Sequence, residues 1–226
     1  MIGRRRFAKS LVAGALVAPM LPALAANGIG VVLLHGKNPG SPTTSRQLEE
    51  LRQAFPGAAC AAEMPNMPWS LRRYIDGGWT KAMEEIGAAL AAQRAGGARF
   101  LVLAGQSLGT AAAISYAALR GDIDALVATA PGHVPRQYYD SPKPFAMLVR
   151  QSVDEARSLV AQGFGQNMGR WSDINQGNTL SVSMRAADYL TYFDPNGDAE
   201  MTNVAPRVPG RIPVLMVVGN RDDAAH

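Results

Sequence analysis

The stretch Phe100-Leu-Val-Leu-Ala-Gly-Gln-Ser-Leu-Gly109 decides the expected fold of this chain. Its first half is a continuous apolar run, which is typical of a buried strand in a parallel sheet. A helical apolar pattern follows over residues 108–119. Ser107 therefore lies on a sharp turn between a strand and a helix, within a Gly-x-Ser-x-Gly motif. Such a turn lifts the serine hydroxyl above the sheet and directs the N-terminus of the next helix toward it.

Apolar segments on both sides of this motif continue the alternation of strands and helices. We expect further strands at residues 31–34, 58–62, 124–129 and 213–218. We expect a further helix over residues 79–94. We expect another that begins after its N-cap residue, Ser45, and ends before Pro56-Gly57. The alternation predicts an α/β fold, with a mostly parallel central sheet flanked by helices on both faces.

The long region over residues 134–207 carries no strong strand signal. Its apolar periodicity predicts one amphipathic helix over residues 145–162 and a shorter one near residues 184–193. We therefore expect a helical cap, inserted at about residues 131–209, that covers the face carrying Ser107.

Residues 1–25 have the pattern of a secretory signal peptide. A basic segment with Arg4, Arg5, Arg6 and Lys9 precedes a short apolar run, and Ala23-Leu-Ala25 matches a cleavage site. The spacing Arg-Arg-x-Phe-x-Lys also resembles the bacterial twin-arginine export signal. An Arg-rich signal for the general secretory route is the alternative, and a membrane-anchored N-terminus is a third reading. We expect a periplasmic or secreted protein without stable membrane insertion after cleavage, and a main domain over residues 26–226.

The charge balance argues against a nucleic-acid partner. The chain has 22 basic and 18 acidic side chains and a pI near 9.5, but four basic residues and no acidic one lie within residues 1–25. The rest of the chain is therefore neutral, without the basic surface that nucleic-acid binding requires.

The lone cysteine, Cys60, excludes an internal disulfide, and with three histidines it cannot build a Cys/His zinc site. We expect no metal and no cofactor.

Taken together, these motifs resemble the α/β-hydrolase superfamily over about residues 28–223. The Gly-x-Ser-x-Gly turn is similar to the nucleophile elbow of that family. His35-Gly36, after the first apolar strand, looks like the oxyanion loop, and Gly219-x-x-Asp222 is similar to the loop that bears the acid.

The resemblance implies a serine hydrolase that cleaves a small carboxylic ester through an acyl-enzyme, and the pattern of residues 1–25 adds that it is exported. Ser107 would be the nucleophile, and the amides of Lys37 (or Gly36) and Leu108 would hold the oxyanion. Asp222, or alternatively Asp223, would be the acid that orients the base.

Three further residues are candidates for contact with the substrate. Gln106 adjoins the nucleophile, and His35 and His133 lie in the loops expected at the same end of the sheet. His35 is expected first of all to order the oxyanion loop. For His133, a general-base role is a further alternative.

The base is the part of the site that departs from the family pattern. The family places its histidine one further strand after the acid, whereas this sequence ends at His226, four residues after Asp222. An acid and a base so close in sequence are poorly placed to act together on Ser107. We therefore expect a chain truncated before the base and before the final strand and helix. His226 as base, or a partner chain that completes the site, is the alternative. A non-catalytic binding protein that retains the fold is the competing function.

Overall fold

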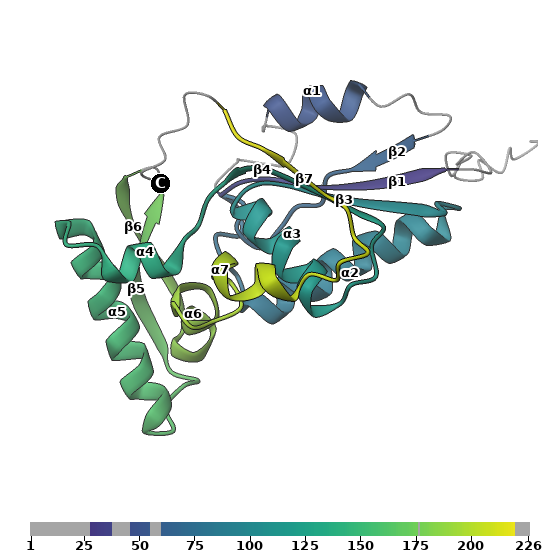
Figure 1. Ribbon diagram of the computed structural model, residues 1–226. Helices are drawn as coiled ribbons and strands as arrows, with labels where there is room; N and C mark the ends of the chain where they lie inside the picture. The colour runs from purple at the N-terminus through teal and green to yellow at the C-terminus, as the bar shows by residue number, and fades with distance from the viewer. Residues whose placement is uncertain (1–27, 38–45, 55–59, 176, 220–226) are drawn as a thin grey trace, which may run out of the picture.

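The computed structural model of the 226-residue chain describes residues 28–37, 46–54, 60–175 and 177–219. Five parallel strands form a sheet in the order β2-β1-β3-β4-β7 (Figure 1). These strands are β1 (Ile29–Leu34), β2 (Cys60–Glu63), β3 (Phe100–Ser107), β4 (Ala125–Pro131) and β7 (Val214–Val217). The helices between the first four strands are α1 (Arg46–Ala54), α2 (Trp79–Ala95) and α3 (Leu108–Leu119). The predicted α/β architecture is confirmed.

Helices lie on both faces of the sheet. Helices α2 and α3 pack against one face, and α1 lies on the opposite side (Figure 1). In β1, Val32 and Leu34 join the large core beneath α2 and α3, while Val31 and Leu33 pack with Cys60 on the other face. The apolar run is continuous because successive side chains of a strand point to opposite faces and both faces are buried.

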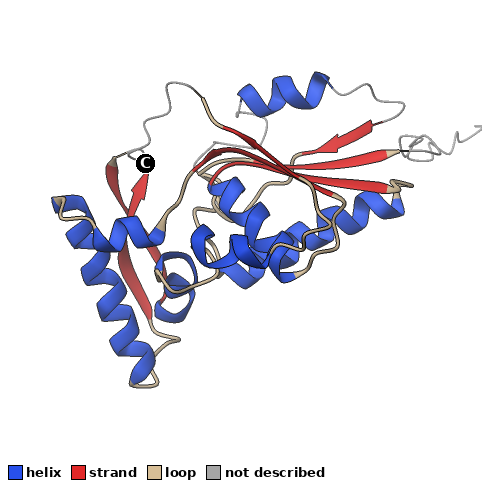
Figure 2. Ribbon diagram, viewed as in Figure 1, coloured by secondary structure: helices blue, strands red, loops and turns tan. Residues whose placement is uncertain are grey.

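The chain between β4 and β7 first forms an insertion beyond the end of the sheet, up to Phe193, and then returns to pack against α3 (Figure 2). It contains α4 (Pro135–Asp140), α5 (Pro144–Ala161), β5 (Met168–Asn175), β6 (Asn178–Arg185), α6 (Ala186–Phe193), α7 (Met201–Val204) and a 3₁₀ turn (Ala205–Arg207). The two expected helices correspond to α5 and α6. The prediction of a purely helical insertion is wrong, because β5 and β6 form an antiparallel hairpin.

Small polar residues in β5 and β6 make the strand pattern of this hairpin hard to detect in the sequence. In β6, Val182 and Met184 are buried while Ser181 and Ser183, which precede them, are exposed, and this alternation is the period of two expected of a strand. Serine is common in loops, so only a few apolar residues mark this period. The hairpin turn includes Gly177, whose φ of 77° is the left-handed conformation that glycine adopts readily.

At the edge of the sheet, β7 pairs with β4 and leaves all four of its side chains exposed. None of the described helices is long and apolar enough to cross a membrane. The predicted signal peptide, residues 1–25, lies outside the described residues.

Candidate active site

Ser107 lies at the junction of β3 and α3 in a strained backbone conformation. Its φ is 53° and its ψ is −121°, a combination that residues with a side chain rarely adopt. The conformation turns the chain sharply from strand into helix. Helix α3 begins directly after Ser107; its first turn contains no acidic residue, and the Ser107 side chain does not cap it. The first N–H groups of a helix favour a negative charge.

Close backbone packing explains both glycines of the motif. A Cβ atom on Gly105 would stand 2.2 Å from the carbonyl oxygen of Gly109. A Cβ atom on Gly109 would stand 2.2 Å from the carbonyl oxygen of Leu34, at the end of β1. Both distances are far below van der Waals contact, so α3 can pack on β3 and β1 only where these two side chains are absent.

Thr110, which the sequence did not indicate as a site residue, stabilises the turn at Ser107 through hydrogen bonds. Its buried Oγ1 lies 2.7 Å from the Gly105 carbonyl oxygen and 2.8 Å from that of Thr129, and it accepts a hydrogen bond from the Thr129 N–H at 3.2 Å. The Thr129 hydroxyl donates to the same Gly105 oxygen at 2.6 Å. These bonds tie the first turn of α3 to β3 and β4.

The loop after β4 forms one wall of the space around the Ser107 hydroxyl. Ala130, near the end of β4, and His133, in the loop, have φ values of 41° and 66°, so the backbone is also strained where the strand passes into the loop. A Cβ atom on Gly132 would stand 2.6 Å from Ser107 Oγ. Glycine at this position therefore keeps the space beside the hydroxyl open.

His35 orders the loop that follows β1. Its ring is fully buried; Nε2 accepts from the Met67 N–H at 3.2 Å, and Nδ1 donates to the Gly36 carbonyl at 2.8 Å. The indole N–H of Trp69 donates to the His35 carbonyl at 2.7 Å. Burial lowers the pKa of His35, which favours the neutral ring that this pattern requires. The ordering role agrees with this geometry, whereas a substrate contact does not, because the ring is sealed from solvent.

The same loop lies directly beside the serine. A Cβ atom on Gly36 would stand 3.1 Å from Ser107 Cβ. Lys37 follows Gly36, and Leu108 follows Ser107 as the first residue of α3. The structure thus brings together the two segments predicted to supply the oxyanion amides. Gln106, a predicted substrate contact, is half-buried at the end of β3 next to Ser107.

His133 is buried and is not at the mouth of the site. Its exposed fraction is 4%, its ring stacks on Trp79, and Nε2 donates to the Tyr192 carbonyl at 2.8 Å. Burial lowers the pKa of His133 to about 3, and the positive charge of Lys37 lowers it further. The burial of the ring disagrees with the expectation that His133 contacts a substrate at the mouth of the site. A pKa so far below neutrality also makes His133 a poor general base.

The remaining predicted residues, Asp222 and His226, lie outside the described residues. Within the described part of the chain, no His, Asp or Glu side chain makes a hydrogen bond with Ser107, and no three His, Cys, Asp or Glu side chains gather into a group that could hold a metal ion.

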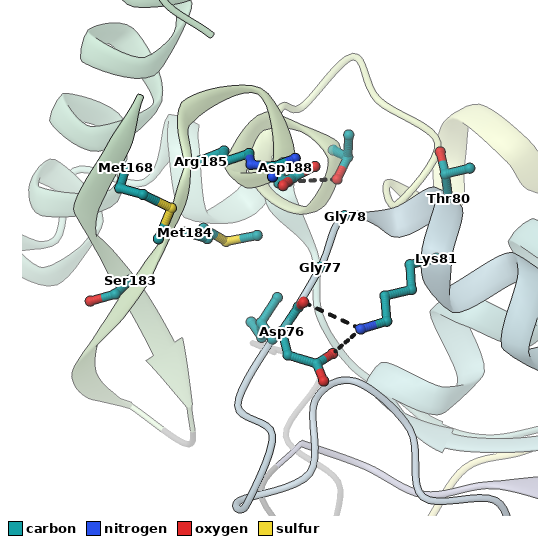
Figure 3. A pocket seen from close by; sticks show the side chains of 12 residues that line it. Asp76, Gly77, Gly78, Thr80, Lys81, Met168, Ser183, Met184, Arg185 and Asp188 are labelled. Atoms are coloured by element: carbon teal, nitrogen blue, oxygen red, sulfur yellow. Dashed lines mark hydrogen bonds and ion pairs between the residues drawn. The ribbon is translucent and has the colours of Figure 1, made fainter. Parts of the chain in front are cut away.

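A cleft of about 480 Å³ opens elsewhere, between the start of α2 and the end of β6 (Figure 3). On one wall, Lys81 Nζ lies 3.0 Å from the Asp76 carboxylate, and Asp188 and Arg185 lie on the opposite wall. None of the predicted site residues lines this cleft. The charges on its walls are mixed, so the cleft has no clear preference for an anion or a cation.

Several solved structures resemble the chain over most of its length. Est1E from Butyrivibrio proteoclasticus aligns with a TM-score of 0.55 and 17% identity, over 88% of this chain and 70% of that chain. A highly thermostable carboxyl esterase from Bacillus coagulans aligns with a TM-score of 0.55 and 16% identity, over 85% and 71%. A siderophore hydrolase, EstB from Aspergillus fumigatus, aligns with a TM-score of 0.54 and 12% identity, over 85% and 70%. The sequence matches no protein-family model and no curated protein.

Proposed function

Since this chain has the α/β-hydrolase fold, we propose that it is a serine hydrolase that cleaves a small carboxylic ester by acyl transfer. The observation that carries the proposal is the strained backbone of Ser107 at the start of α3, with φ of 53°. Such strain persists where the surrounding structure enforces it, and at this position it presents the hydroxyl to a substrate. Solved structures that share the fold include a carboxyl esterase and a siderophore hydrolase. This similarity favours an ester as the substrate.

In the proposed reaction, Ser107 Oγ attacks the carbonyl carbon of the ester while its proton passes to a histidine base. The carbonyl oxygen becomes an oxyanion, which the amides of Lys37 and Leu108 bind; each such donor lowers the barrier by about 3 kcal/mol. Collapse of the intermediate breaks the carbon–oxygen bond, and the alcohol leaves with the proton. Water then cleaves the acyl-Ser107 ester and releases the carboxylic acid.

We propose Asp222 as the acid that orients the base. His226 is an alternative for the base, since the family pattern places that histidine one further strand after the acid. The assignment of Asp222 rests on its position just after Gly219, at the end of the last parallel strand. The carboxyl ends of parallel strands meet at one edge of a sheet, which is also the edge that carries Ser107.

Hydrolysis of p-nitrophenyl acetate and butyrate by the purified full-length protein tests this proposal. Ser107→Ala is expected to lower kcat/KM by at least about a thousandfold, because removal of the nucleophile removes the acyl-enzyme route. Equal rates for both proteins would favour the alternative, a non-catalytic binding protein with the same fold.

We also propose that residues 1–25 direct export to the periplasm or beyond, by the twin-arginine route. The basic segment, the short apolar run and the Ala-x-Ala site support export. The Arg4-Arg5-x-Phe7-x-Lys9 spacing supports the choice of route.

A further inference from the structure

A buried ion pair joins the loop beside Ser107 to the inserted hairpin. Lys37 Nζ lies 2.5 Å from Asp173 Oδ1 in β5 and donates to the Ile174 carbonyl at 3.1 Å. The side chains of Lys37 and Asp173 are only 4% and 0% exposed. These residues are 136 positions apart in the sequence, so the pair is a long-range connection between the sheet and the insertion.

The surroundings of the pair satisfy both charges. Asp173 Oδ1 also accepts from the Ile174 N–H at 2.7 Å, and Oδ2 accepts from the Tyr74 hydroxyl. The Lys37 ammonium additionally faces the ring of Phe193, 5.5 Å from its centroid. A buried ion pair loses much of its attraction to desolvation, so its main effect is to impose one geometry on the segments that it joins.

The segment over residues 67–74, which contains Tyr74, also forms hydrogen bonds with His35, at the start of the loop that contains Lys37. Met67 and Trp69 donate to His35 from the same stretch of chain in which Tyr74 donates to Asp173. Residues 35–37, 67–74 and 173–174 therefore form one hydrogen-bonded unit. A displacement of the hairpin would reach Lys37 directly, through the bond from its ammonium to Asp173. It would reach His35 through Tyr74, which donates to Asp173, and residues 67–74.

We propose that Lys37 and Asp173 are positioning residues, through which the inserted β5–β6 hairpin sets the placement of the Lys37 backbone amide beside Ser107. This inference rests on the proposed function, because the amide matters for catalysis only if it binds an oxyanion. An amide donor acts on the transition state, so its misplacement lowers kcat more than it raises KM. A shift of about 1 Å in such a group can cost about a hundredfold in rate.

Three substitutions in the full-length protein test the proposal. Asp173→Asn and Lys37→Met each break the ion pair, and Tyr74→Phe removes one hydroxyl while leaving both charges in place. Asp194→Asn is the matched control, because Asp194 also forms an ion pair within the insertion, with Arg157 at 2.8 Å. Hydrogen–deuterium exchange of peptides covering residues 35–37 and 168–185 measures the coupling without reference to activity.

We expect Asp173→Asn and Lys37→Met to speed exchange in both segments and to lower kcat for p-nitrophenyl acetate by about ten- to a hundredfold, with KM changed less than about threefold. Tyr74→Phe should change both readouts in the same direction by a smaller factor. Asp194→Asn should leave exchange at residues 35–37 and kcat unchanged.

Two results would overturn the proposal: faster exchange confined to the hairpin, or a wild-type kcat in folded Asp173→Asn and Tyr74→Phe proteins. If the wild-type protein hydrolyses no ester, the proposed function fails instead. The exchange measurement then still decides whether the hairpin controls the loop.

Discussion

Gly132 approaches Ser107 so closely that a methyl group on its Cα would stand 2.6 Å from the serine Oγ. The contact comes from the pairing of β3 with β4, in which Ser107 lies opposite Pro131. The strained turn at the end of β3 and the strained loop at the end of β4 thus meet at one hydroxyl. If Ser107 is the nucleophile, the substrate needs the space that Gly132 leaves open.

Gly132→Ala should therefore impair the reaction of Ser107 far more than it impairs folding. We expect kcat/KM for p-nitrophenyl esters to fall at least about tenfold, because the methyl group crowds the attacking oxygen. Gly210→Ala is the control, since a Cβ atom there meets nothing within 4 Å. Equal kinetics for the two variants would show that the loop after β4 does not border the reacting atoms.

Removal of the Thr110 hydroxyl should loosen the turn that presents Ser107. Thr110→Val keeps the shape of the side chain but leaves backbone groups of Gly105 and Thr129 with fewer partners. We expect a loss of about 1–3 kcal/mol in the free energy of unfolding, measured by urea denaturation. Thr179→Val makes the same change at an exposed position in β6 and should cost less than about 0.5 kcal/mol. Equal losses at both sites would contradict the role assigned to Thr110.

His133 should make the folded state sensitive to acid. Burial lowers its pKa to about 3 from an ordinary value of 6.5, so between these values the unfolded chain binds a proton that the folded chain excludes. The stability linked to His133 is complete above pH 6.5 and is lost as the pH falls toward 3. Its slope approaches about 1.4 kcal/mol per pH unit within that window.

Urea denaturation of the wild type and of His133→Phe between pH 4.5 and 7 measures this effect. The variant loses the bond to the Tyr192 carbonyl and should be less stable at pH 7, but its stability should depend less steeply on pH. The two proteins differ only at position 133, so the difference in slope reports on His133. Identical slopes would mean that His133 does not stay neutral in the folded protein.

Much of the fold could be predicted because apolar periodicity reports directly on burial. The run in β1 and the helical pattern from Leu108 to Leu119 match the observed elements, since the core of the sheet encloses both. The hairpin of the insertion could not be found in this way, because serines interrupt its apolar positions and Asp173 occupies a buried one. A buried carboxylate gives no hydrophobic signal, and its partner Lys37 lies 136 residues away.

The candidate site was predictable only where a motif encodes it locally. The Gly-x-Ser-x-Gly turn and His35-Gly36 are each a short run of consecutive residues, so each is visible in the sequence. The structure places the two runs side by side. Thr110 and Gly132 act through contacts between neighbouring strands, which a single sequence does not display. His133 was misplaced because its loop sequence, with Pro131 and Gly132, is typical of the surface, whereas its ring enters an aromatic core beside Trp79 and Phe193.

The proposed export route makes a separate prediction. Replacement of both Arg4 and Arg5 by lysine should abolish export of the full-length protein in a bacterial host with a twin-arginine system. Cell fractionation and immunoblotting measure the exported fraction, and Arg6→Lys, which lies outside the arginine pair, is the control. Undiminished export of the double variant would assign residues 1–25 to the general secretory route.

The most direct test of the central claim is the reaction of the full-length protein with a fluorophosphonate, which forms a covalent bond with activated serine nucleophiles. Mass spectrometry of the labelled protein should locate the adduct on Ser107 alone, and Ser107→Ala should remain unlabelled. Labelling should also be slower in Gly132→Ala, because the methyl group crowds Oγ. Absence of an adduct on Ser107 in the folded wild-type protein would contradict its role as the nucleophile.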